Sequence, residues 1–107
     1  MKPSLPIVCN MNVFTPEQRD AHLQRTNQLF AKVASVAAQE NGYRFALPYE
    51  AESLIELGKF IANERLCCPF LEFSLTVKPG EEPVLLSLSG PEGTREFLRA
   101  EFSEAFA

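Results

Sequence analysis

The first part of the chain has apolar residues at helical spacing behind a strong helix-start signal. Thr15 is a suitable N-cap, Pro16 suits the first helical position, and Gln18 stands where a capping box needs it. The apolar positions that follow recur with a period close to that of a helix: Leu29, Phe30, Val33, Val36 and Ala37. This pattern predicts a helix from about Pro16 to Glu40, with Asn41-Gly42 as its stop.

A second stretch of helical period covers residues 50–68. Leu54, Leu57 and Ile61 lie on one predicted face, and the same line continues through Glu64 to Cys68. Pro69 cannot continue a helix and disfavours helical geometry at the residue before it. We therefore expect this helix to end at the cysteines.

Alternation of apolar and polar residues predicts the strands. Residues 43–47 form a short strand that ends at Pro48, and residues 71–77 are the clearest strand in the chain. Residues 79–82 predict a turn, and residues 84–89 the returning strand of a hairpin. A last helix opens after residues 90–94, with an apolar stripe made of Phe97, Leu98, Phe102 and Phe106.

The predicted order is helix, strand, helix, strand, strand, helix. This order favours an α+β fold in two layers, with three to four mostly antiparallel strands and helices on one face. A length of 107 residues suits a single domain that spans residues 1–107. Within it, residues 1–14 contain Pro3 and Pro6 and predict an extended N-terminal arm or an edge strand.

Composition and charge exclude several classes of protein. The net charge is −4 and the basic residues are scattered, so no stripe suited to nucleic-acid phosphates is expected. No apolar run approaches the roughly 18 residues of a membrane helix, and the N-terminus does not resemble a secretory signal. Three cysteines, two of them adjacent, do not predict a framework of crosslinks. A reducing cytoplasm is the simplest expected setting.

The candidate site is the run Glu64-Arg65-Leu66-Cys67-Cys68-Pro69-Phe70. Glu64 precedes the two cysteines by three and four residues, so all three side chains meet across one helical turn. Glu64 also lies on the face expected to point inward, where an unpaired charge is costly. Its expected partner is a cation, an arginine such as Arg44 or Arg99, or a proton.

The position of the cysteines at a helix C-terminus selects among chemistries. The helix dipole there carries about −0.5 charge, and Glu64 adds a negative charge, so both raise a thiol pKa. An activated nucleophile is therefore disfavoured, and an enzyme is poorly supported. The same field favours a soft or borderline cation such as zinc, bound by Glu64, Cys67 and Cys68 with Cys9 and His22 as candidate helpers. The spacing matches no standard zinc pattern.

Two other interpretations stay open. Cys67 and Cys68 can form a strained disulfide that acts as a redox switch. Alternatively, the cysteines are core packing, since free cysteine is often fully buried. His22 is then a helix-surface residue at the edge of the core. The sequence thus predicts a binding module for a soft metal or reversible thiol chemistry, with a structural or interaction protein, homodimeric, as the alternative.

The segment from Phe60 to Phe73 resembles a motif of small bacterial proteins, E-R-x-C-C-P-F-x-x-F. Those chains continue with a hairpin and a "GPEG…FL" helix, as residues 90–98 do here, so the likeness covers roughly residues 43–100. That family has no established activity, so the resemblance implies a fold unit and a recurring Glu-Cys-Cys-Pro cluster without naming a substrate. Similar cysteine-bearing segments occur in bacterial heavy-metal-responsive proteins, but the DNA-binding helices of such regulators are missing here.

Overall fold

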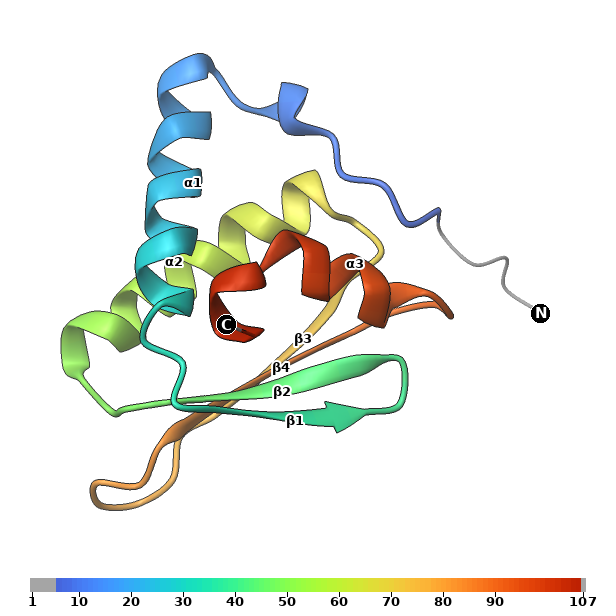
Figure 1. Ribbon diagram of the computed structural model, residues 1–107. Coiled ribbons are helices and arrows are strands. Elements are labelled where there is room, and N and C mark those ends of the chain that lie inside the picture. Colours follow the sequence, from blue (N-terminus) through green and yellow to red (C-terminus); the bar gives the residue numbers. More distant parts are fainter. Residues whose placement is uncertain (1–5, 107) are drawn as a thin grey trace.

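The structure is a computed structural model that describes residues 6–106, and it has two layers. Three helices lie on one face of a four-stranded sheet (Figure 1). The elements in chain order are a 3-10 helix η1 (Met11–Val13), α1 (Pro16–Phe30), β1 (Ser35–Gln39), β2 (Gly42–Leu47), α2 (Ala51–Cys67), β3 (Glu72–Thr76), β4 (Val84–Ser89), α3 (Thr94–Glu101) and a 3-10 helix η2 (Ser103–Phe106).

All neighbouring strands of the sheet are antiparallel, in the order β1-β2-β4-β3. The prediction of an α+β fold with helices on one face is confirmed. Phe45 of β2 stands opposite Val36 on one side and Leu86 on the other, so apolar side chains from three strands share the face under the helices.

The core lies between that sheet face and the three helices. Its centre is a group of aromatic rings in which Phe30 stacks on Phe102 at 4.3 Å and meets Phe45 and Phe60 edge-on at 5.1 and 5.4 Å. Each of these rings comes from a different element, so the group joins α1, α2, β2 and the end of α3. The packing fixes α1 against α2, and this contact positions the candidate site.

The prediction of one helix from Pro16 to Glu40 is wrong in its second half. α1 starts as expected, with the capping box between Thr15 and Gln18, but it ends at Phe30, and residues 35–39 form strand β1. Asn41 has a left-handed φ of 52° and makes a two-residue hairpin turn to β2 rather than a helix stop. The apolar spacing fits either state, and pairing with β2 selects the strand.

Most other boundaries agree with the expectations within one or two residues, and the element order gains one strand between the first two helices. The last predicted helix, with a stripe that reaches Phe106, is divided into α3, which ends at Glu101, and the 3-10 helix η2. In the arm, residues 6–14 contain η1 and no strand, whereas residues 1–5 lie outside the described part of the chain. None of the helices within residues 6–106 has the length and apolar character that a membrane crossing requires.

Candidate functional site

The site forms where the C-terminal turn of α2 packs against α1. Cys67 is the last residue of α2, and the backbone N–H of Cys68 donates to the carbonyl of Glu64 at 2.8 Å, which closes the final turn. Glu64 and Cys67 therefore point the same way from one turn, as their spacing of three predicts. Both are buried, with 2% and 1% of their surface exposed.

His22 completes this cluster from α1. Its Nε2 lies 2.8 Å from Oε1 of Glu64, and the histidine is 2% exposed. The prediction of a helix-surface histidine at the edge of the core is therefore wrong. The partner of Glu64 is thus His22 and neither of the two arginines that the sequence suggested. Arg44 is exposed, and Arg99 lies over the ring of Phe106 at 4.7 Å.

A sequence signal for the inward position of His22 does exist. The buried residues of α1 are His22, Thr26, Leu29 and Phe30, which follow the spacing i, i+4, i+7 and i+8 of one helix face. Tracing the apolar line back by two turns from Phe30 reaches His22. The sequence does not reveal that this face meets Glu64, because the two residues are 42 positions apart.

Aromatic rings line the histidine on two sides. The ring of Phe14 is 5.3 Å from the imidazole and that of Phe60 is 5.9 Å from it, with Phe60 stacked. Such apolar walls lower the local dielectric and strengthen the interaction between His22 and Glu64. The Nδ1 atom of His22 is buried and has no hydrogen-bond partner within residues 6–106, so core packing leaves the imidazole incompletely satisfied.

Three sulfur atoms gather at the same turn. Cys68 forms a disulfide with Cys9 of the arm, across 59 residues of sequence, and Cys67 is a free thiol. The expectation of cysteines without crosslinks is therefore wrong, because the arm folds back onto the end of α2. The alternative bridge between Cys67 and Cys68 is also not the one formed, and their sulfur atoms lie 3.6 Å apart.

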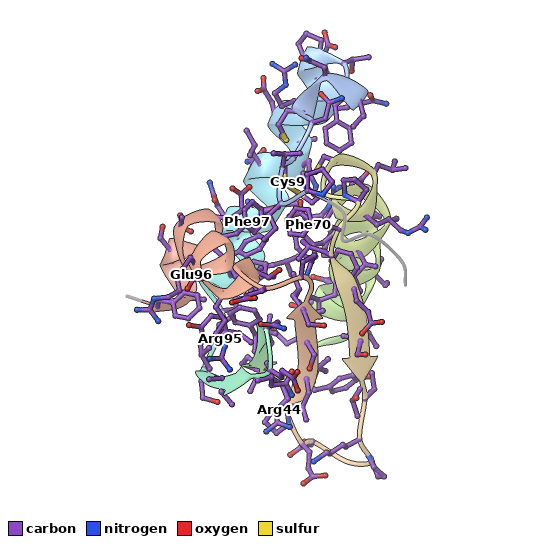
Figure 2. All side chains as sticks on the ribbon, turned by 90° about the vertical axis from the view of Figure 1, so that its right-hand side faces the viewer. Cys9, Arg44, Phe70, Arg95, Glu96 and Phe97 are labelled. Atoms are coloured by element: carbon purple, nitrogen blue, oxygen red, sulfur yellow. A yellow bond between two sulfur atoms is a disulfide. The ribbon has the colours of Figure 1, made fainter. Side chains whose placement is uncertain are left out.

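Cys9 lies at the C-terminal end of α2, where it is bonded to Cys68, and it appears near Phe70 in the view of Figure 2. Phe70, two residues after Cys68, meets Phe97 of α3 edge-on at 5.0 Å, so the segment that follows the cysteines packs against α3. Cys68 is 0% exposed, whereas Cys9 is half-buried. The outer sulfur of the disulfide is thus the one nearer to solvent.

Electrostatics keep Cys67 protonated. Burial raises the pKa of the Cys67 thiol from 9.0 to about 12, and the negative charges of Glu64 and Glu101 act in the same direction. Its sulfur lies 3.4 Å from Oε1 of Glu64 and 3.5 Å from the carbonyl oxygen of the same residue, so the thiol proton has an acceptor. At neutral pH Cys67 is a poor nucleophile, as its place at a helix C-terminus predicts.

Glu101, at the end of α3, adds a second carboxylate to the rim of the site. Partial loss of hydration raises the pKa of its carboxyl group, the charge of Glu64 raises it further, and His22 lowers it. These couplings put Glu101 within electrostatic range of both residues, although the side chain remains exposed. The site therefore carries two carboxylates against one imidazole.

The raised pKa of Cys67 predicts a specific loss of stability at alkaline pH. The unfolded thiol ionises from about pH 9, whereas the folded thiol stays protonated to about pH 12, so the contribution of Cys67 is complete below pH 9 and falls as the pH rises. The loss is about 1.4 kcal/mol per pH unit in that window. Urea unfolding at pH 8 and pH 10 should show this extra loss in the wild type and not in Cys67→Ala. Parallel pH profiles for the two proteins would contradict it.

His22, Glu64 and Cys67 are side chains of the kinds that ligate metal ions in proteins. The ligand atoms of His22, Glu64 and Cys67 all lie within 4.8 Å of one another. Neighbouring ligands of a tetrahedral zinc ion are roughly 3.3–3.6 Å apart, given zinc bonds of about 2.0–2.3 Å. The 3.4 Å between Cys67 Sγ and Glu64 Oε1 falls in this range. The 2.8 Å between His22 Nε2 and Glu64 Oε1 is a hydrogen-bond distance, and these two atoms would have to move apart by about 0.5 Å to share an ion.

Comparison of the chain with family models, with curated proteins and with solved structures finds no match.

Proposed function

We propose that this protein is a small metal-binding module that holds a soft or borderline divalent cation, such as Zn²⁺ or Cd²⁺, with His22, Glu64 and Cys67. The observation that carries the proposal is the meeting of three buried ligand-type side chains from two helices, with their ligand atoms within 4.8 Å. Packing rarely buries a carboxylate, an imidazole and a thiol together unless they satisfy one another or a shared ion.

The donor set indicates the class of cation. One thiolate, one imidazole and one carboxylate suit zinc and its softer relatives, whereas calcium and magnesium prefer oxygen ligands alone. The high pKa of Cys67 does not prevent this, since a bound cation offsets the negative charges that raise it. Binding then releases the thiol proton and makes the affinity increase with pH.

The set differs from the one that the sequence suggested. Cys68 and Cys9 were candidates as thiolate ligands, and as partners in a disulfide they have no thiol to deprotonate. His22 takes their place beside Glu64 and Cys67. Three protein ligands leave the fourth position of a tetrahedral ion to be filled by a further donor that the ion brings with it, such as a water molecule.

The proposal is tested by metal titration of the oxidised protein, with the disulfide intact and one free thiol counted per denatured chain. Isothermal titration with Cd²⁺ and Zn²⁺ should give one ion per chain, and Cd²⁺ should add thiolate-to-metal absorbance in the near ultraviolet. Cys67→Ser and Glu64→Gln should each weaken binding by more than about 100-fold, since loss of a direct ligand exceeds the 10–100-fold cost of losing an outer-shell partner.

Glu72→Gln is the matched control, because Glu72 is an exposed carboxylate on β3. It should bind as the wild type does. Circular dichroism checks that each variant is folded before its titration is interpreted. Folded Cys67→Ser and Glu64→Gln proteins that keep wild-type affinity would show that the metal binds elsewhere, and the proposal would be abandoned.

The second candidate is a structural or interaction role, favoured by the near-complete burial of Cys67 and Cys68. In that case the cluster is a satisfied part of the core, metal titration shows no uptake, and the protein acts through self-association as a homodimer. Sedimentation at micromolar concentration tests the dimer, and a monomer would count against it. The reducing cytoplasm suggested by the sequence keeps the Cys67 thiol free, but a structural disulfide such as Cys9–Cys68 is rare in that compartment, so the oxidised site fits an oxidising setting better.

A further inference from the structure

Five ligand-type side chains meet at the end of α2, and two of them are held in a disulfide. The Cys68 sulfur lies 3.6 Å from Oε2 of Glu64 and 3.6 Å from the Cys67 sulfur. As a disulfide sulfur it carries no proton, so the first of these is a contact and not a hydrogen bond. The bonded partner, Cys9, brings a third sulfur to the same place.

The arm that carries Cys9 is held by contacts besides the disulfide. The backbone N–H of Asn10 donates to the carbonyl of Cys67 at 2.7 Å. Ile7 and Met11, on either side of Cys9, pack partly buried against the core. A broken disulfide therefore leaves the Cys9 side chain near the other two sulfurs.

We propose that reduction of the Cys9–Cys68 disulfide converts the site into a thiolate-rich one that selects soft cations such as Cd²⁺, Hg²⁺ or Cu⁺, with Cys9, Cys67 and Cys68 as sulfur ligands. This inference rests on the proposed function, because it adds ligands to the cluster of His22, Glu64 and Cys67. Thiolates bind soft ions more tightly than neutral disulfide sulfur does. The disulfide then sets both the affinity and the metal preference.

The reduction is chemically balanced with a dithiol as the reductant. Its first thiolate attacks the half-buried Cys9 sulfur, forms a mixed disulfide there and releases Cys68 as a thiolate. Its second thiol attacks the mixed disulfide and frees Cys9. The protein disulfide gains two electrons and two protons, and the dithiol becomes a disulfide.

Charge couples reduction to metal binding. Two further thiolates beside Glu64 and Glu101 give a strongly negative, mostly buried cluster, which has to be neutralised by protons or by a cation. A metal that prefers the reduced form draws the disulfide toward reduction by linkage. A hundredfold preference corresponds to a rise of about 59 mV in the midpoint potential of this two-electron couple.

The test compares Cd²⁺ affinity in the oxidised and reduced full-length protein, by anaerobic competition with a chromophoric chelator after the reductant has been removed. The reduced wild type should bind at least 100-fold more tightly than the oxidised wild type. Under the same reducing conditions, Cys9→Ser should bind Cd²⁺ at least tenfold more weakly than the reduced wild type. In glutathione buffers, Cd²⁺ should raise the midpoint potential of the Cys9–Cys68 disulfide in the wild type.

Unfolded thiols also bind Cd²⁺, so a second variant distinguishes a built site from a loose one. In the reduced state, Glu64→Gln should lose at least tenfold in affinity if the folded cluster holds the ion, because an unfolded chain is indifferent to that change. If neither Glu64→Gln nor Cys9→Ser loses Cd²⁺ affinity in the reduced state, the inference is overturned.

The outcomes also separate this inference from the proposed function. Equal affinities in the oxidised and reduced wild type overturn the redox inference and leave the three-ligand site standing. Binding by the reduced protein alone, lost in Cys9→Ser, overturns the three-ligand site and supports the thiolate-rich one. Binding by neither form overturns both.

Discussion

Replacing His22 by leucine is expected to lower the free energy of unfolding by about 3–5 kcal/mol, because the buried Glu64 carboxylate then loses its partner. Both side chains are about 3% exposed, so water cannot replace the imidazole at 2.8 Å. Leucine keeps an apolar side chain of roughly similar size between the rings of Phe14 and Phe60. The loss in the free energy of unfolding therefore comes mainly from the unpaired charge of Glu64 and only to a small extent from a cavity.

The reverse change should cost less. Glu64→Leu leaves the His22 imidazole without its hydrogen-bond partner, for which the penalty is about 1–3 kcal/mol. The double variant His22→Leu/Glu64→Leu should be more stable than His22→Leu alone, because replacing a buried polar pair by apolar residues is often neutral or stabilising. The measurement is urea unfolding followed by circular dichroism, with the disulfide intact and a chelator present.

The double-mutant cycle also bears on function. If the losses of the two single variants simply add in the double variant, the pair is not coupled and the distance of 2.8 Å has no energetic meaning. If the double variant folds well but binds no Cd²⁺, the pair is retained for the metal rather than for stability. That result would favour the metal module over the structural role.

Reduction of the Cys9–Cys68 disulfide is expected to lower the free energy of unfolding by about 4 kcal/mol. The bond spans 59 residues, and closing a loop of that length lowers the conformational entropy of the unfolded chain by about 4 kcal/mol in free energy. Urea unfolding of the wild type with and without a dithiol reductant, both with a chelator present, measures the difference.

Cys9→Ser provides the matched control, since its stability should not respond to the reductant. Addition of Cd²⁺ to the reduced wild type at 100 times its dissociation constant should restore up to about 2.7 kcal/mol, because the ion binds the folded form more tightly than the unfolded thiols. Equal stability of the oxidised and reduced wild type would contradict the expectation and would mean that the arm does not constrain the unfolded chain.

Local signals account for what the sequence predicted correctly in the site. The end of α2 at the cysteines follows from the helical period and Pro69, and the meeting of Glu64 with Cys67 follows from their spacing of three. The expected rise in the pKa of the Cys67 thiol follows in part from the neighbouring Glu64, whereas its largest cause, burial, comes from the tertiary packing. Apart from this burial, each of these needs only a few consecutive residues.

The same local reasoning failed where two structures fit one pattern. Residues 31–40 have apolar positions that suit a helix, yet Ser35–Gln39 form β1. Val36 is β-branched and stands opposite Phe45, so pairing with β2 gives the strand a partner that the isolated segment lacks. The hairpin around Asn41 therefore selects the strand over the helix for these residues.

The sequence by itself determined the two-layer α+β class, the helix that carries Glu64 and Cys67, and the negative charge that Glu64 brings to that helix end. Only the tertiary structure decided which residues complete the cluster. His22 comes from 42 residues away through the packing of α1 on α2, and Cys9 comes from 59 residues away through the return of the arm. Spacing along a helix is fixed by its geometry, whereas contacts between distant segments depend on how the whole core packs.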